Sequence, residues 1–99
     1  MTPRESATET RLTRAVLRAG ALTFKLAPTT AGIPDRIVVW PTGVVDFVEV
    51  KADDGRVAPI QHKRIRDLRE RGANVFVAYG YAGVDAYVAA RLAEVLPDR

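Results

Sequence analysis

Asp35, Glu49 and Lys51 are the residues of this sequence whose types and spacing point most directly to chemistry. Glu49 and Lys51 end the segment VVDFVEVK, residues 44–51, whose β-branched and aromatic residues predict a strand. Side chains two apart on a strand point to the same face, so this acid and this base are expected side by side. Such a cluster is suited to binding a divalent cation and to acid–base work on a polyanion.

Asp35 is expected to approach Glu49 across a hairpin. Residues 35–40 and 44–51 predict two antiparallel strands around the turn at residues 41–43, and the start of one strand then lies near the end of the next. Two neighbouring buried carboxylates repel one another, so they take up protons, separate or share a cation. Lys51 on the same face is placed to orient or deprotonate a water molecule, or to stabilise transition-state charge.

The elements that must position these side chains follow from hydrophobic spacing and turn residues. Helices are predicted over residues 5–19, 59–71 and 84–96, and strands over 21–27, 35–40, 44–51 and 74–79. The order is αβββαβα, which predicts a single α/β domain over residues 1–99. Trp40, Tyr79 and Tyr81 are expected to be packing residues.

The positive charge of the chain is concentrated in one segment. Residues 56–71 contain six basic and two acidic residues, a local charge of +4, so the remainder of the +3 chain carries −1. A basic helix beside an acidic strand end favours a polyanionic partner, although a solvated helix face gives the same pattern.

Composition limits the kinds of site and location. The 99 residues include no cysteine and one histidine, His62, so a metal site must use mainly oxygen ligands, which suit magnesium or manganese. No apolar run approaches the roughly 20 residues of a membrane span, and the N-terminus lacks an apolar signal region. A cytoplasmic protein with no membrane partner is expected.

Several pieces of the sequence together resemble a known nuclease family. They are ESATETRL, Lys25, GIPDRIVV, FVEVK, Gly55, Gln61 and RGANVFVAY, and they cover nearly the whole chain. In this order they resemble the VRR-NUC branch of the PD-(D/E)xK nuclease superfamily. The resemblance implies a restriction-endonuclease-like αβββαβ core, with a central mixed sheet flanked by helices. It also implies Mg²⁺- or Mn²⁺-dependent cleavage of DNA. Stand-alone members of this size are known from phages, and they resemble junction-resolving dimers.

The resemblance also implies roles for individual residues. The implied catalytic residues are Asp35, Glu49, Lys51 and Gln61, and the implied metal ligands are Glu9, Asp35, Glu49 and the backbone carbonyl of Val50. Residues assigned to DNA binding are Lys25, Arg36, Lys63, Arg64 and Arg66.

Each role has a structural alternative. Asp35 alone is also a common turn residue, Glu49 with Lys51 a solvated edge pair, and Glu9 a surface acid. Gln61 lies on the apolar stripe of its helix, where a hydrogen bond to loop backbone is the alternative to a role beside Lys51. Glu5 is expected to be only a favourable charge at a helix start. Ala58 replaces the serine usual at the cap of the helix over residues 59–71.

The sequence therefore predicts a metal-dependent deoxyribonuclease acting on branched DNA, such as a junction, as a homodimer. Two alternatives remain open, a non-cleaving DNA-binding module and a structural subunit that keeps the nuclease fold. The intact set of Asp35, Glu49 and Lys51 favours the enzyme.

Overall fold

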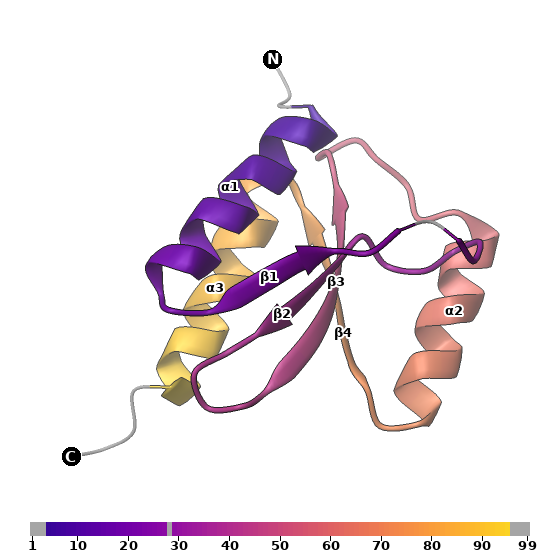
Figure 1. The fold of residues 1–99 in the computed structure, drawn as a ribbon. Coiled ribbons are helices and arrows are strands. Elements are labelled where there is room, and N and C mark those ends of the chain that lie inside the picture. The colour runs from indigo at the N-terminus through magenta and orange to yellow at the C-terminus, as the bar shows by residue number, and fades with distance from the viewer. Residues whose placement is uncertain (1–3, 28, 96–99) are drawn as a thin grey trace.

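The elements of the chain follow the predicted order. A computed structural model describes residues 4–27 and 29–95. Within them lie the helices α1 (Glu5–Arg18), α2 (Pro59–Glu70) and α3 (Gly80–Val95), and the strands β1 (Leu22–Lys25), β2 (Arg36–Val39), β3 (Val45–Lys51) and β4 (Asn74–Tyr79). Figure 1 shows α1 and α3 on one face of the sheet and α2 on the other.

The four strands form one mixed sheet in the order β1–β2–β3–β4. β1 with β2 and β2 with β3 are antiparallel, whereas β3 and β4 are parallel and are joined by the crossover through α2. The β2–β3 hairpin turns at the predicted residues, and Gly43 takes the positive φ of 88° that glycine adopts without strain. The predicted α/β class, a mixed sheet flanked by helices, is confirmed.

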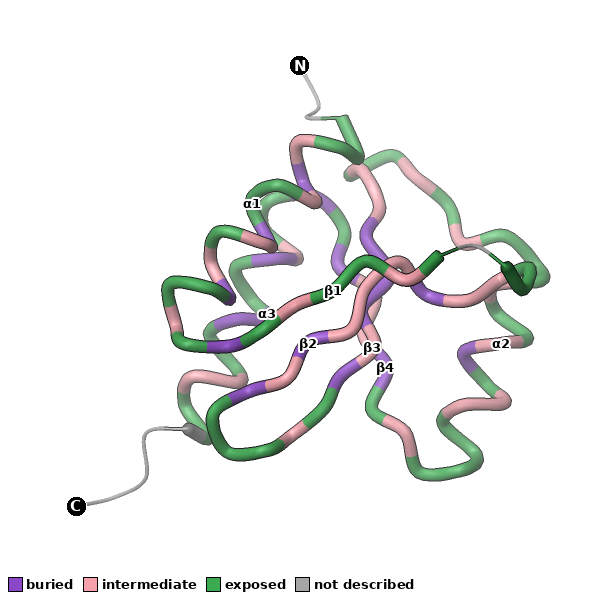
Figure 2. The backbone as a smooth tube through the Cα atoms, viewed as in Figure 1, coloured by how far each residue is buried: buried purple, intermediate pink, exposed green. Residues whose placement is uncertain are grey.

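The main core lies between the sheet and the pair α1 and α3. Leu12 and Val16, one turn apart on α1, are completely buried, as is Val84 of α3. The sheet contributes Val38, Val48, Val50 and Ala78 to the same cluster. Figure 2 shows this burial on the inward sides of α1 and α3, whereas α2 is largely exposed.

α2 covers the other face of the sheet only in part. It packs against β4, and Ile65 is its buried residue. Moving outward from β4, the paired residues Val75, Phe47, Ile37 and Phe24 become progressively more open, from 5% exposed at Val75 to 55% at Phe24. Alternation along the strands defines an open apolar face made of Leu22, Phe24, Ile37, Val39, Val45 and Phe47.

Asp46 is a fully buried acid that the sequence patterns did not single out. Its Oδ1 accepts a hydrogen bond from Arg91 Nη2 at 2.7 Å, and its Oδ2 accepts from Arg91 Nε at 2.8 Å and from the Tyr87 hydroxyl at 2.6 Å. Trp40 Nε1 also donates to Oδ2, at 3.0 Å, so the predicted packing role of Trp40 agrees with its position. The sequence carried one signal of this burial, because Asp46 lies two residues before Val48 and therefore on the same apolar strand face. An acid buried there requires partners.

Two element boundaries differ clearly from the predicted ones. β1 has four residues instead of the seven predicted over 21–27, and α3 begins at Gly80 instead of Val84. Gly80 follows β4 without a loop, with a φ of 61°, and a Cβ there would collide with the Asp53 carboxylate. Glycine is required at this turn, and α3 begins there, four residues before the predicted start. The predicted helix end at Leu96 lies outside the described residues.

None of the helices within residues 4–27 and 29–95 is long and apolar enough to cross a membrane.

Candidate active site

The hairpin brings Asp35 to the end of β3, as its register requires. Arg36 pairs with Val48, so Asp35, one residue before β2, lies opposite Glu49. The Asp35 Oδ2 accepts a hydrogen bond of 2.9 Å from the backbone N–H of Val50. Because Asp35 lies just outside the strand ladder, its side chain turns onto β3 and fixes one carboxylate beside the other.

Glu49 is a buried acid with an incomplete set of partners. Its side chain is 2% exposed, and its Oε2 lies 2.8 Å from Gln61 Nε2 and 3.3 Å from Lys51 Nζ. The Oε1 is buried and has no hydrogen-bond partner among the described residues. The pKa of Glu49 is raised to about 7, mainly by burial and in addition by the negative charge of Asp35, against the opposing effect of Lys51. An unpartnered buried carboxylate oxygen is costly, which is the condition a bound cation relieves.

Lys51 lies on the same face as Glu49, as the alternation of the strand predicts. Its side chain is 13% exposed, so the ammonium group is held largely within the site. Lys51 pairs in the parallel ladder with Tyr79, the last residue of β4. The base therefore stands at the carboxyl ends of two adjacent strands.

Gln61 bonds to Glu49 and also to loop backbone, the structural alternative considered for it, while a role beside Lys51 stays a prediction. Its amide nitrogen donates to Glu49 Oε2, and its Oε1 accepts a 2.8 Å hydrogen bond from the backbone N–H of Ala58. Ala58 has no side-chain acceptor for the N–H of Gln61, but Gln61 supplies the other half of a capping box by accepting from the N–H of Ala58. One amide thus orients Glu49 and fixes α2 to the end of β3.

Glu9 lies in a separate cluster with two cations. Its carboxylate is 2.8 Å from Arg36 Nη1 and 3.1 Å from Lys25 Nζ, and Arg36 also donates to Thr23 Oγ1. Burial raises the pKa of Glu9, but the hydrogen bonds from Arg36 and Lys25 outweigh it and lower the pKa overall. Across residues 4–27 and 29–95 no group of three acidic or histidine side chains is placed to hold an ion. The predicted set of Glu9 with Asp35 and Glu49 is therefore not assembled here.

Glu5 is the α1 acid whose charge reaches Glu49. Its negative charge contributes to the raised pKa of Glu49. Glu5 was expected only to favour the helix start, although the spacing of Glu5 and Glu9 was a signal that either acid can face the site. Residues four apart share a helix face but stand one turn, about 6 Å, apart along the axis. Which of the two acids reaches the site depends on how far α1 extends past β3.

The residues assigned to DNA binding lie in two places. Lys25 and Arg36 flank Glu9, with the Lys25 side chain 64% exposed and that of Arg36 only 12% exposed. Lys63 and Arg64 on α2 lie near Asp67, and Arg64 Nε also donates to the Ala31 carbonyl. Arg66 is exposed. Their contacts with DNA remain predictions.

The geometry can now be compared with known proteins. The family model for the VRR-NUC domain matches residues 5–82, which span α1 to the start of α3. The chain is 35% identical over 75 residues to "Putative nuclease p44" of Acyrthosiphon pisum secondary endosymbiont phage 1, covering 75% of this chain and 81% of the phage protein.

A solved structure described as a VRR_NUC domain is also similar. It superimposes with a TM-score of 0.80 at 34% identity, over 86% of this chain and 94% of the other chain. The similarity therefore extends over most of the fold of this chain.

Proposed function

Because this chain belongs to the VRR-NUC domain family, we propose that it is a nuclease that hydrolyses phosphodiester bonds of DNA with Mg²⁺ or Mn²⁺. The observation that carries the proposal is the buried Glu49 carboxylate, with one unpartnered oxygen, between Asp35 and Lys51. A structural acid at this depth would be expected to have all its acceptors satisfied, as those of Asp46 are.

The residues at the end of β3 fit a divalent cation. Asp35, Glu49 and the backbone carbonyl of Val50 would hold it, and they supply the oxygen ligands that Mg²⁺ and Mn²⁺ prefer. When bound, the ion supplies positive charge that offsets the two acids and the charge growing on the phosphate. The raised pKa of Glu49 supports this fit, because burial and then the charge of Asp35 disfavour the ionised carboxylate, and a bound cation would offset both effects.

The side chains of the chain have separate tasks in hydrolysis. Lys51 donates hydrogen bonds to the attacking water or to a phosphate oxygen, which positions the nucleophile and stabilises the transition state. Gln61 holds the Glu49 Oε2 at 2.8 Å and so fixes the carboxylate plane. Water forms the new bond to phosphorus as the bond to the leaving deoxyribose oxygen breaks.

Branched DNA cut by a homodimer is the finer part of the proposal. A two-fold dimer would present paired sites to the two strands of a junction. The open apolar face supports association, because Leu22 and Phe24 are 58% and 55% exposed on a strand with an unpaired edge.

Cleavage of a panel of labelled DNAs tests the function. Junction, flap, single-stranded and duplex DNA are incubated with the protein and either Mn²⁺ or a chelator. We expect cleavage with Mn²⁺ only, fastest on the junction. In Lys51→Ala the rate should fall by roughly 100-fold or more, with DNA affinity nearly unchanged, because Lys51 acts on the transition state.

Arg71→Ala is the matched control, since it removes one positive charge at the far end of α2. It should cleave at close to the wild-type rate. Undiminished cleavage by Lys51→Ala would place the chemistry elsewhere, and DNA binding without cleavage by the wild type would favour the non-cleaving module.

A further inference from the structure

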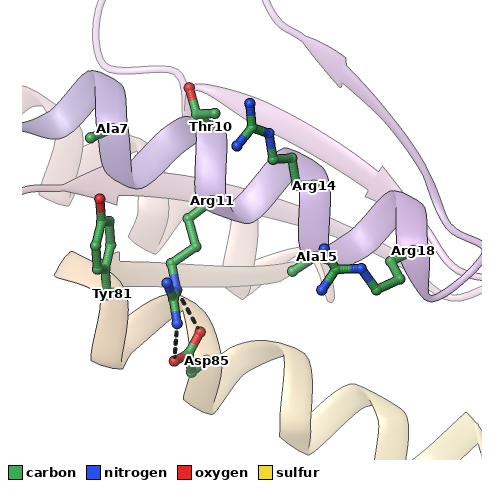
Figure 3. Close-up of a pocket in the computed structure, with 8 residues that line it drawn as sticks. All are labelled: Ala7, Thr10, Arg11, Arg14, Ala15, Arg18, Tyr81 and Asp85. Atoms are coloured by element: carbon green, nitrogen blue, oxygen red, sulfur yellow. Dashed lines mark hydrogen bonds and ion pairs between the residues drawn. The ribbon is translucent and has the colours of Figure 1, made fainter.

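A groove lined by arginines runs between α1 and α3, on the face of the molecule opposite α2. Its volume is about 570 Å³, and Figure 3 shows its lining side chains. The residues are Ala7, Thr10, Arg11, Arg14, Ala15 and Arg18 of α1, with Tyr81 and Asp85 of α3. This arginine groove contains none of the residues assigned to catalysis or to DNA binding above.

One face of α1 builds the groove. The lining residues of α1 follow one another at alternating spacings of three and one, so they form a single stripe beside the buried stripe of Leu12 and Val16. The small side chains of Ala7 and Ala15 leave the space open between α1 and α3. From Ala7 to Arg18 the stripe is roughly 16 Å long at the helical rise per residue.

The arginines of the groove differ in their partners. Arg11 makes a two-pronged ion pair with Asp85, at 2.9 and 2.8 Å, and its guanidinium lies 4.5 Å from the centre of the Tyr81 ring. Arg14 and Arg18 are exposed and form no ion pair or side-chain hydrogen bond with any residue in 4–27 or 29–95. Figure 3 shows the Arg11–Asp85 pair between the helices and the other two arginines along α1. With three arginines and one acid, the groove has a net charge of +2.

The groove begins at the edge of the molecule that carries the candidate active site. Lys51 pairs with Tyr79, and Tyr81 follows two residues later at the start of α3. Glu5, at the start of α1, contributes to the electrostatics of Glu49. In Figure 1 the first turns of α1 and α3 lie beside the upper end of β3, which is the carboxyl end that carries Glu49 and Lys51. A chain of phosphates leaving Lys51 can therefore reach the groove around this end of the sheet.

We infer that the arginine groove binds the sugar–phosphate backbone of the DNA arm that leads away from the cleaved bond. The inference rests on the proposed nuclease function. Arginine suits this task, because its guanidinium donates paired hydrogen bonds to phosphate oxygens. A groove roughly 16 Å long spans about five phosphates of one strand at ~3.4 Å each along the duplex axis. Arg11 fixes the walls, while Arg14 and Arg18 remain free to bind.

Salt dependence of DNA binding is the first test. Binding of a duplex of about 30 base pairs is measured in the Lys51→Ala background, so that the DNA stays intact. Relative to that background, Arg14→Gln with Arg18→Gln should lower the slope of log affinity against log salt by about 1.8. Arg14→Lys with Arg18→Lys should keep most of the slope, and Arg71→Gln should leave it unchanged. Because both groove arginines are exposed, the thermal unfolding midpoint should not change.

A chelate attached to the groove gives its position relative to the cut. The chain contains no cysteine, so Arg18→Cys offers a single attachment point for an iron chelate that cleaves nearby DNA backbone. On a junction, cuts should cluster about five base pairs from the bond that the wild type hydrolyses. A chelate at Arg71→Cys should give no such cluster.

The outcomes separate this inference from the proposed function. If the wild type cleaves DNA but the slope is unchanged in Arg14→Gln with Arg18→Gln, or the chelate cuts evenly, the groove is not a DNA site although the nuclease stands. If the slope depends on both arginines while the wild type cleaves nothing, the groove binds DNA but the catalytic proposal, and with it the position of the groove relative to a cleaved bond, fails.

Discussion

At the level of single residues, Glu49 is a buried acid whose surroundings disfavour its ionised form. Its pKa of about 7, against an ordinary 4.5, results from burial and from Asp35, and Lys51 compensates only in part. An acid with a raised pKa destabilises the fold once it ionises. Activity and stability therefore place opposite demands on this residue.

The pH dependence of the free energy of unfolding measures how strongly the fold disfavours ionised Glu49. Glu49 holds its proton in the folded state up to about pH 7 but loses it near 4.5 when unfolded, so the folded state binds more protons between these values. The free energy of unfolding of metal-free wild type should therefore fall as pH rises through this window, by up to about 3 kcal/mol relative to Glu49→Gln. Urea unfolding with a chelator present checks this.

The same variant tests the metal site. Glu49→Gln should lose Mn²⁺ binding by calorimetry, because the substitution removes one anionic ligand. Parallel pH profiles for the two proteins would mean that Glu49 is not the strained group, and unchanged Mn²⁺ affinity would place the ion at other ligands.

The grouping of Asp35, Glu49 and Lys51 could be predicted from the sequence, whereas the α1 acid nearest to them could not. Asp35, Glu49 and Lys51 could be grouped because strand alternation and hairpin register are short-range rules. The choice between Glu5 and Glu9 could not be made, because it depends on where α1 lies along the sheet. That position results from packing of Leu12 and Val16, which the local pattern does not encode.

At the level of elements, two ion pairs join α3 to the rest of the fold in different environments. The pair of Arg91 with Asp46 joins α3 to β3, with side chains 12% and 0% exposed. The pair of Arg11 with Asp85 joins α3 to α1, with side chains 44% and 55% exposed. Burial decides how much each pair matters, because solvent screens the exposed one.

Removing Arg91 should therefore destabilise the protein strongly. Arg91→Met leaves the Asp46 carboxylate buried without its cation, and the expected loss is about 3–5 kcal/mol in the free energy of unfolding. Denaturant unfolding gives the value, with Arg11→Met as the matched control, for which a much smaller loss is expected. Similar losses for the two variants would show that the Asp46 cluster is not the principal connection between β3 and α3.

The bounds of the elements were predictable where a strong local signal marks them. The bounds of β4 and the start of α2 agree with the sequence, because an apolar strand and a proline at the first helical turn are strong local signals. The start of α3 was missed because Gly80 acts through its contact with Asp53, which is 27 positions away in the sequence. A close approach of this kind has no local signature.

At the level of the whole molecule, the sheet is covered unequally. α1 and α3 cover one face, whereas the single helix α2 leaves the open apolar face on the other. A small domain that buries little of its chain benefits from association, and the unpaired edge of β1 offers backbone hydrogen bonds as well.

Phe24→Glu tests association through this face. If a second copy covers the open apolar face, a charge at Phe24 should convert a dimer into a monomer at micromolar concentration, as measured by sedimentation velocity. Leu17→Glu is the matched control, since Leu17 is 52% exposed on α1, away from this face. A wild type that is monomeric at these concentrations would remove the dimer from the proposal.

The two buried acids of β3 have a consequence for how this protein can change over evolution. Asp46 and Glu49 point to opposite faces of one strand, and they share none of the hydrogen-bond or ion-pair partners described for them. On one face the Asp46 carboxylate is paired through both oxygens and holds the strand in place. On the other face, one oxygen of Glu49 has no partner among the described residues. Substitutions on the two faces should have nearly independent effects, because the acids have no common partner. The chemistry on the Glu49 face can therefore change during evolution while the Asp46 face preserves the fold.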